Sequence, residues 1–237
     1  MNQTLIFDID DTLYNQTIPI CEASQEASGL PIHDPEAFYR LFHKRSNEMF
    51  FREQAGEISL EQSRIYRYIL TMKDTGFSCD EDTAARFQHL YEARLASLKL
   101  SPVFEALFND LFRSGIRMGI LTNGPSDHQR KKFMALGLNR WIPPDHVLVS
   151  GDTSWAKPDP RLFEEMVKRM GGIPSSFMMI GDSWENDILP AFKAGWHTLW
   201  YTHHGIKRPE KVPPGVPDGT VQTEKELAEF LKSFLCG

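Results

Sequence analysis

Four helix-and-strand pairs follow one another between residues 101 and 202, and this alternation constrains the fold more than any other feature of the sequence. Apolar strands that alternate with helices of about 10–15 residues are typical of a parallel sheet covered on both faces. The predicted helices span residues 103–115, 126–137, 159–172 and 184–195, and the strands span residues 116–122, 147–150, 176–182 and 197–202.

The two ends of the chain extend this pattern. The short apolar run at residues 5–8 predicts a buried strand, which we assign to the same sheet. A further helix is expected at 224–235, and the segment 204–220, which contains four prolines, predicts an irregular surface connection. We therefore expect an α/β domain with a Rossmann-like parallel sheet, built from residues 1–13 and 101–237.

The segment 14–100 has a different character, with helical spacing, many aromatic side chains and few β-branched runs. Ser59 followed by Gln62 matches a capping box and predicts the start of a helix. Three or four helices without an intervening strand indicate a helical bundle inserted near the start of the α/β domain.

Charge and cysteine content narrow the functional classes. The net charge is −6, and the basic run Arg130, Lys131, Lys132 is short enough to be the solvated face of a helix, so we expect no nucleic acid polymer as partner. The three cysteines have no C-x-x-C pair, which favours free thiols in a reducing compartment. Because we find neither a basic n-region nor an apolar run of about 18 residues, we expect a cytoplasmic protein without a membrane partner.

Polar residues follow three of the predicted strands at their carboxyl ends. Asp8 ends the first strand, Thr122 ends the strand 116–122, and Asp182 ends the strand 176–182. Ligands of such sheets bind outside the carboxyl ends of the strands, so we expect the chemistry at this edge. Asp8 and Asp10 project to the same side of an extended segment, while Ile9 points into the core.

Four motifs in order resemble the haloacid dehalogenase (HAD) superfamily. FDIDDTLY is similar to its first motif, D-x-D-x-T, and ILTNG is similar to its second, a Thr or Ser after an apolar strand. Lys157 in AKPDPRLF resembles the third motif, and IGDSWENDI resembles the acidic fourth. The helical insertion at 14–100 lies where this family carries a C1-type cap domain, and residues 1–13 and 101–237 correspond to its catalytic core.

The resemblance implies a role for each motif residue. Asp8 is the expected nucleophile, and Asp10 is the expected acid/base, since a carboxylate can attack phosphorus and a second one can exchange protons with the leaving oxygen and with water. Thr122, Asn123 and Lys157 are expected at the phosphate, with Thr122 and Lys157 also counted as catalytic. Asp11 is expected to serve the turn after the strand, where Asp is favoured.

The same resemblance implies Mg²⁺ as cofactor. Asp8, Asp182, Asp187 and the backbone carbonyl of Asp10 are the expected metal ligands, because Mg²⁺ prefers oxygen donors and offsets such a concentration of acidic groups. Asp187 has an alternative role, which is to orient the ligands or to favour the start of a helix.

The expected activity is Mg²⁺-dependent hydrolysis of small phosphorylated metabolites through an aspartyl-phosphate, by a monomer or homodimer. The loop 54–59 resembles a segment of nucleotidase-like members, so nucleotides are among the candidate substrates. Asp10 favours phosphoryl transfer over dehalogenation, because a departing halide needs no proton. A phosphomutase, a dehalogenase and a non-catalytic phosphometabolite-binding protein remain the alternatives.

Overall fold

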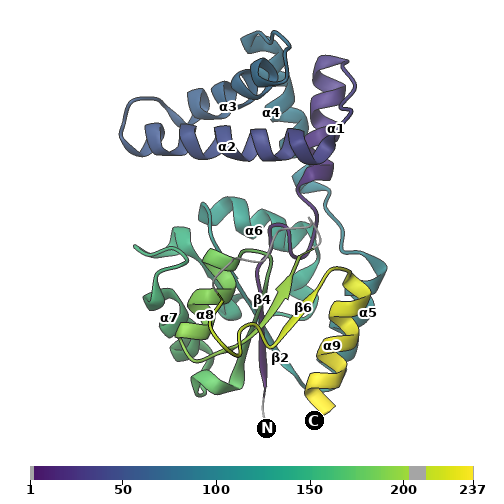
Figure 1. Cartoon of the computed structure of the whole chain (residues 1–237), viewed down its shortest axis with the longest axis vertical. Coiled ribbons are helices and arrows are strands. Elements are labelled where there is room, and N and C mark those ends of the chain that lie inside the picture. Colours follow the sequence, from purple (N-terminus) through teal and green to yellow (C-terminus); the bar gives the residue numbers. More distant parts are fainter. Residues whose placement is uncertain (1–2, 203–211, 237) are drawn as a thin grey trace. The chain divides into compact units, whose positions relative to one another are not determined.

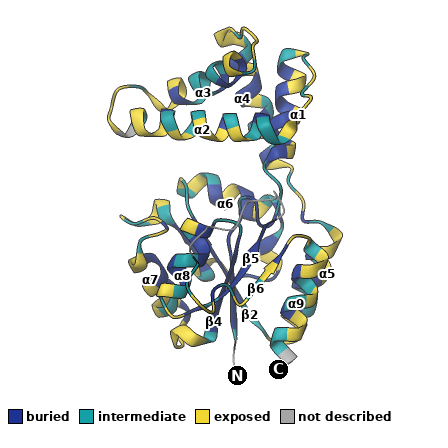
Figure 2. Cartoon of the chain, viewed as in Figure 1, coloured by how far each residue is buried: buried dark blue, intermediate teal, exposed yellow. Residues whose placement is uncertain are grey.

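The computed structural model describes residues 3–202 and 212–236 and divides the chain into two compact units. The first, here called the α/β unit, comprises Met1–Tyr14 and Leu98–Gly237, and the second, the helical unit, comprises Asn15–Ser97. Figures 1 and 2 show the course of the chain and the burial of its residues.

The α/β unit is built on a six-stranded sheet in the order β3-β2-β1-β4-β5-β6, in which every neighbouring pair is parallel. The prediction of a Rossmann-like parallel sheet is therefore confirmed. The order reverses between β1 and β4, which is where open α/β sheets place their ligands. The strands are β1 (Thr4–Phe7), β2 (Arg117–Thr122), β3 (Val147–Val149), β4 (Phe177–Gly181), β5 (His197–Tyr201) and β6 (Gly219–Val221).

Helices cover both faces of this sheet (Figure 1). Leu5 and Phe7 of β1 pack into one apolar cluster with residues of α5 and α9, and Ile6 packs into another with residues of α7, because successive strand residues point to opposite faces. The helices are α5 (Pro102–Arg113), α6 (Ser126–Ala135), α7 (Pro160–Met170), α8 (Leu189–Lys193) and α9 (Glu224–Cys236). Short helical turns span Leu138–Arg140, Pro144–His146, Ser150–Asp152, Pro174–Ser176 and Trp184–Ile188.

The helical unit consists of α1 (Thr17–Ser28), α2 (Pro35–Gln54), α3 (Leu60–Asp74) and α4 (Glu81–Ala96). Ser59 and Gln62 form the predicted capping box at the start of α3. The unit has its own aromatic core, in which the rings of Tyr68 and Phe87 stack with centroids 3.9 Å apart. Phe42 packs against Phe87 at a steeper angle, as is common for aromatic pairs.

One prediction about the C-terminal part holds for residues 212–218 and was wrong at the end of the segment. The proline-containing segment 204–220 was expected to be irregular, but its end enters β6, where Gly219 pairs with Leu199 of β5. The strand is only three residues long. Thr220 and Val221 are β-branched and favour a strand, and the edge of β5 offers the backbone groups with which they pair. Residues 203–211 of this segment lie outside the described residues.

Among residues 3–202 and 212–236, no helix has both the length and the apolar character that crossing a bilayer requires.

Candidate active site

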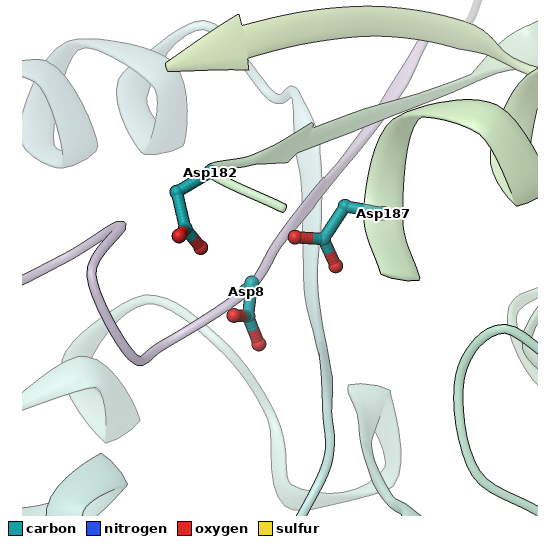
Figure 3. A group of neighbouring side chains, drawn as sticks. All are labelled: Asp8, Asp182 and Asp187. Carbon is teal, nitrogen blue, oxygen red and sulfur yellow. The ribbon is translucent and has the colours of Figure 1, made fainter. Parts of the chain in front are cut away.

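Three carboxylates meet at the carboxyl edge of the sheet, beside the reversal of strand order (Figure 3). Asp8 directly follows β1, Asp182 directly follows β4, and Asp187 lies on the helical turn Trp184–Ile188. One oxygen from each of the three carboxyl groups lies within 4.8 Å of the others. The motifs predict these aspartates at one site, and the neighbouring positions of β1 and β4 bring them together.

The turn that carries Asp187 is closely fitted to the end of β4. Gly181 leaves no room for a side chain, because a Cβ atom there would collide with the Asp187 carboxylate. Ser183 caps the turn: its hydroxyl accepts a hydrogen bond from the Asn186 N–H, and its own N–H donates to Asp187 Oδ2 at 3.0 Å. These contacts fix the Asp187 carboxylate toward Asp8.

Lys157 supplies the positive charge of this cluster. Its Nζ donates to Asp187 Oδ1 at 2.6 Å and lies 3.0 Å from Asp8 Oδ1, and its side chain is 2% exposed. Burial by itself would lower the pKa of Lys157, but the carboxylates of Asp187 and Asp8 raise that pKa above its usual value. Lys157 is therefore a permanent cation at the site.

Asp8 and Asp182 resist ionisation in this cluster. Burial raises the pKa of Asp8 to about 6; the charge of Lys157 opposes this shift, while the negative charges of Asp187 and Asp10 add to it. Burial also raises the pKa of Asp182 well above its usual value, and Asp187, Asp8 and Asp11 contribute in the same direction. One lysine does not compensate this set of carboxylates, so the site favours a further cation.

Asn123 and Thr122 follow β2 at the same edge. Both ends of the Asn123 amide bind the backbone of Lys157: Nδ2 donates to the Lys157 carbonyl at 2.9 Å, and Oδ1 accepts from the Lys157 N–H at 2.8 Å. The Asn123 side chain thus holds the lysine loop in place. Thr122 is the last residue of β2 and is buried, and the Gly124 N–H donates to Ser150 Oγ.

Asp10 follows Asp8 by two residues, and both of its carboxylate oxygens accept hydrogen bonds. Tyr14 Oη donates to Oδ1 at 2.5 Å, Gln129 Nε2 donates to Oδ2 at 2.8 Å, and Lys132 Nζ contacts Oδ1 at 2.6 Å and Oδ2 at 2.9 Å. Burial by itself would raise the pKa of Asp10, but the charge of Lys132 and the hydrogen bonds from Lys132, Tyr14 and Gln129 lower that pKa below its usual value.

The chain turns sharply between Asp10 and Leu13. Asp11 has a φ of 54°, a left-handed conformation that Asp tolerates better than most residues, and the N–H of Leu13 donates to the Ile9 carbonyl at 3.0 Å. Ile9 is buried as expected. The interpretation of Asp11 as a turn residue agrees with this geometry.

The sequence model of the haloacid dehalogenase-like hydrolases matches residues 3–195, which is most of the chain. The chain belongs to this family. It is a hydrolase, as the four motifs predicted, and its matched region contains all of the aspartates and lysines described above.

Its relatives include enzymes named for phosphate esters. A glyceraldehyde 3-phosphate phosphatase of Methanothermobacter thermautotrophicus is 29% identical over 208 residues, which cover 84% of this chain and 85% of that protein. A phosphoserine phosphatase of Thermus thermophilus is also 29% identical, over 96% of this chain and 99% of that protein. Among solved structures, the HAD hydrolase YfnB of Bacillus subtilis shares the fold, with a TM-score of 0.69 and 22% identity over 97% of this chain and 98% of that one.

Sequence reasoning missed two residues of this HAD-like hydrolase. The run Arg130, Lys131, Lys132 was predicted to be a solvated helix face, which is wrong for Lys132, because that residue is buried against Asp10. Gln129 was not singled out at all. The available signal was spacing: residues 129 and 132 are three apart on α6 and so share one face of that helix, whereas Lys131 points away from it.

Proposed function

We propose that this chain is a Mg²⁺-dependent phosphatase that hydrolyses small phosphomonoesters through an aspartyl-phosphate on Asp8. The observation that carries the proposal is the buried contact of Asp8 with Lys157 beside Asp182 and Asp187, at the sheet edge where α/β proteins bind ligands. The two phosphatase relatives, aligned over most of their lengths, support a phosphate ester as the bond that is broken.

The donor set fits Mg²⁺. Asp8 Oδ1 is buried and in ion-pair contact with Lys157, yet it accepts no hydrogen bond from the described residues. Both oxygens of Asp187 are already engaged, by Lys157 and by the Ser183 N–H. We therefore assign Asp8, Asp182 and the Asp10 backbone carbonyl to the metal, and we assign Asp187 to the orientation of Lys157. When bound, Mg²⁺ would offset the acidic charge and polarise the phosphoryl oxygens.

In the first half of the reaction, an Asp8 carboxylate oxygen attacks phosphorus. The bond between phosphorus and the ester oxygen breaks, its electron pair stays on that oxygen, and the oxygen takes a proton from the carboxyl group of Asp10. The ammonium group of Lys157 holds Asp8 in place and faces the phosphoryl oxygens, while the Thr122 hydroxyl donates to them. The products of this half are the free alcohol and phosphorylated Asp8.

In the second half, a water oxygen attacks the phosphorus of the aspartyl-phosphate and gives a proton to Asp10. The bond between phosphorus and Asp8 then breaks, which releases inorganic phosphate and restores both carboxyl groups. Asp10 distinguishes this reaction from dehalogenation, since a halide leaves without a proton.

We also propose that the helical unit selects the substrate. Its surface includes the exposed rings of Phe50 and Phe51 next to Arg52, whose guanidinium pairs with Glu57. An aromatic pair beside a cation suits an anionic substrate that carries a base or a sugar. The variant Arg52→Met should change discrimination among phosphorylated metabolites more than it changes turnover of a small generic ester, and an equal loss for every substrate would count against this role.

The experiment that tests the function is a phosphate-release assay on purified protein with a panel of phosphomonoesters, with Mg²⁺ and with EDTA. We expect release only with Mg²⁺, and we expect Asp8→Asn to lower kcat by about 10⁴-fold, since no other carboxylate replaces the nucleophile. Circular dichroism should show a folded variant. Absence of Mg²⁺-dependent phosphate release from every ester, or a fully active Asp8→Asn variant, would overturn the proposal.

A further inference from the structure

Lys132 occupies a position that is costly for a lysine. Its side chain is 9% exposed, whereas that of its neighbour Lys131 is 76% exposed. A buried ammonium group is stable only when it is paired, and the Asp10 carboxylate provides that partner with both of its oxygens. The Nζ atom also lies 5.8 Å from the centre of the Tyr14 ring. The contact with Asp10 therefore accounts for the burial of Lys132.

Gln129 connects two loops of the site. Its Nε2 donates to Asp10 Oδ2 at 2.8 Å and to the Asn123 carbonyl at 2.7 Å. Because both partners are acceptors, the orientation of the amide group is determined. Gly124 makes this possible, since a Cβ atom there would lie 2.8 Å from Nε2. The loop after β1 and the loop after β2 are thus held by one side chain of α6.

Together these contacts restrain the Asp10 carboxylate. An ionised carboxylate has about four lone-pair directions. Tyr14, Lys132 and Gln129 approach its two oxygens from three sides, with two contacts at Oδ1 and two at Oδ2. Rotation of the group about its Cβ–Cγ bond would break several contacts at once, so the carboxylate has a single orientation.

We propose that Lys132 is a positioning residue for Asp10, and that Gln129 and Tyr14 complete the same cradle. The inference rests on the function proposed above, in which Asp10 gives its proton to the leaving oxygen and takes one from water. Proton transfer requires a heavy-atom separation of about 2.6–3.2 Å, and a displacement of about 1 Å can cost 10²-fold in rate. Without Lys132 the carboxylate can rotate away from this geometry.

The test compares Lys132→Met with the matched control Lys131→Met on two esters, para-nitrophenyl phosphate and the best alkyl phosphomonoester of the panel. Nitrophenolate leaves without a proton, whereas an alkoxide does not. We expect Lys132→Met to slow the phosphorylation of Asp8 about 10²-fold with the alkyl ester and less than about 10-fold with the nitrophenyl ester, as rapid-quench measurements of that step would show. Hydrolysis of the phosphorylated Asp8 is common to both esters and should slow equally for both. Lys132→Arg should retain more activity than Lys132→Met, and Lys131→Met should match the wild type.

The outcomes separate the two proposals. If the wild type releases phosphate from neither ester, the proposed function fails and this inference fails with it. If the wild type is active but Lys132→Met equals Lys131→Met, or slows the phosphorylation step of both esters to the same degree, only the positioning role is overturned. Should circular dichroism show that Lys132→Met does not fold, the variants Gln129→Leu and Tyr14→Phe replace it in the test. A selective loss of the phosphorylation rate with the alkyl ester supports the cradle, and no selective loss in that step overturns it.

Discussion

The two units of this chain differ in whether they bury charged side chains. Among the described residues, every buried residue that carries a charge lies in the α/β unit, and the buried polar residues of the helical unit are uncharged. The charged set is Asp8, Asp11, Lys132, Lys157 and Asp187, and the uncharged set is Thr17, Ser24, Ser63, Thr71 and Gln88. Buried charges cost free energy unless they are paired, so their concentration at one sheet edge indicates a function that requires them.

The helical unit keeps its ion pairs near the surface. Arg94 pairs with Glu22 and Glu26, whose side chains are half exposed. Its most enclosed cation is Arg67, which is partly exposed and lies over the ring of Phe42. The comparison indicates that aromatic packing stabilises the helical unit, whereas the α/β unit gives up some stability for a charged site.

The largest effect on stability is expected in the aromatic core of the helical unit. Phe87→Ala removes a fully buried ring that stacks on Tyr68, and the resulting cavity should destabilise this unit by about 3–5 kcal/mol. Hydrogen exchange should show faster exchange in α3 and α4, with β1 and β4 still protected. The control Phe51→Ala, at a ring that is 70% exposed, should change little. Equal loss of protection in both units would show that the chain unfolds as one cooperative body. The two units would then not be stabilised separately.

The next effect concerns the buried cation of the α/β unit. Lys157→Met leaves Asp8 and Asp187 buried without their partner, so the free energy of unfolding should fall by about 3 kcal/mol at neutral pH in EDTA. Chemical denaturation measures this change. Lys168→Met on α7 is the matched control, because the side chain of Lys168 is 84% exposed. A variant as stable as that control would mean that the buried contacts of Lys157 add no stability.

A smaller effect on the stability of the fold is expected when pH and Mg²⁺ are varied together. The pKa of Asp8 is raised to about 6 from 3.8, so protonated Asp8 stabilises the metal-free fold at low pH, and this contribution is lost as the pH rises through about 6. Mg²⁺ needs the ionised form, so its stabilising effect should be about 1.4 kcal/mol smaller at pH 5 than at pH 7.5. Thermal melts with and without Mg²⁺ at both pH values measure the difference. A Mg²⁺ effect that is independent of pH would contradict the assignment of Asp8 to the metal.

The smallest effect on the free energy of unfolding is expected for an ion pair at the surface of the helical unit. Arg45 donates from Nε and Nη2 to the two oxygens of Asp74 at 2.7 Å, and both side chains are about one-fifth exposed. Solvent and salt screen such a pair, so Arg45→Met should stay within about 1 kcal/mol of the wild type in denaturation experiments. A loss as large as that of Lys157→Met would remove the distinction between the ion pairs of the two units.

The sequence predicted what depends on local pattern. Apolar runs followed by Asp8, Thr122 and Asp182 located the strands and their carboxyl ends, and the spacing of Ser59 and Gln62 located the start of α3. These signals are readable because strand burial and helix capping involve residues close in sequence.

Features that depend on distant partners were not predictable. The spacing of residues 129 and 132 places them on one face of α6, but it does not identify the partner of that face, Asp10, which lies 122 residues earlier. In the same way, β6 depends on a distant partner, because it forms by pairing with the edge of β5. Phe50 and Phe51 share helical spacing with Phe38 and Phe42, but only the latter two are buried in the bundle, and the helix face that packs is set by the neighbouring helices.

In the proposed reaction Asp8 becomes phosphorylated, and Asp10 gives a proton to the leaving oxygen and takes one from water. Rapid quench of Asp10→Asn with para-nitrophenyl phosphate and Mg²⁺, followed by intact-protein mass spectrometry, tests this most directly. Nitrophenolate leaves without the acid, whereas hydrolysis of the acyl-phosphate still requires the base. We expect a burst of about one equivalent of nitrophenol per active site, and a trapped phosphoryl group that peptide mapping locates on Asp8. Turnover of both ester types at the wild-type rate, with no phosphorylated protein, would contradict it.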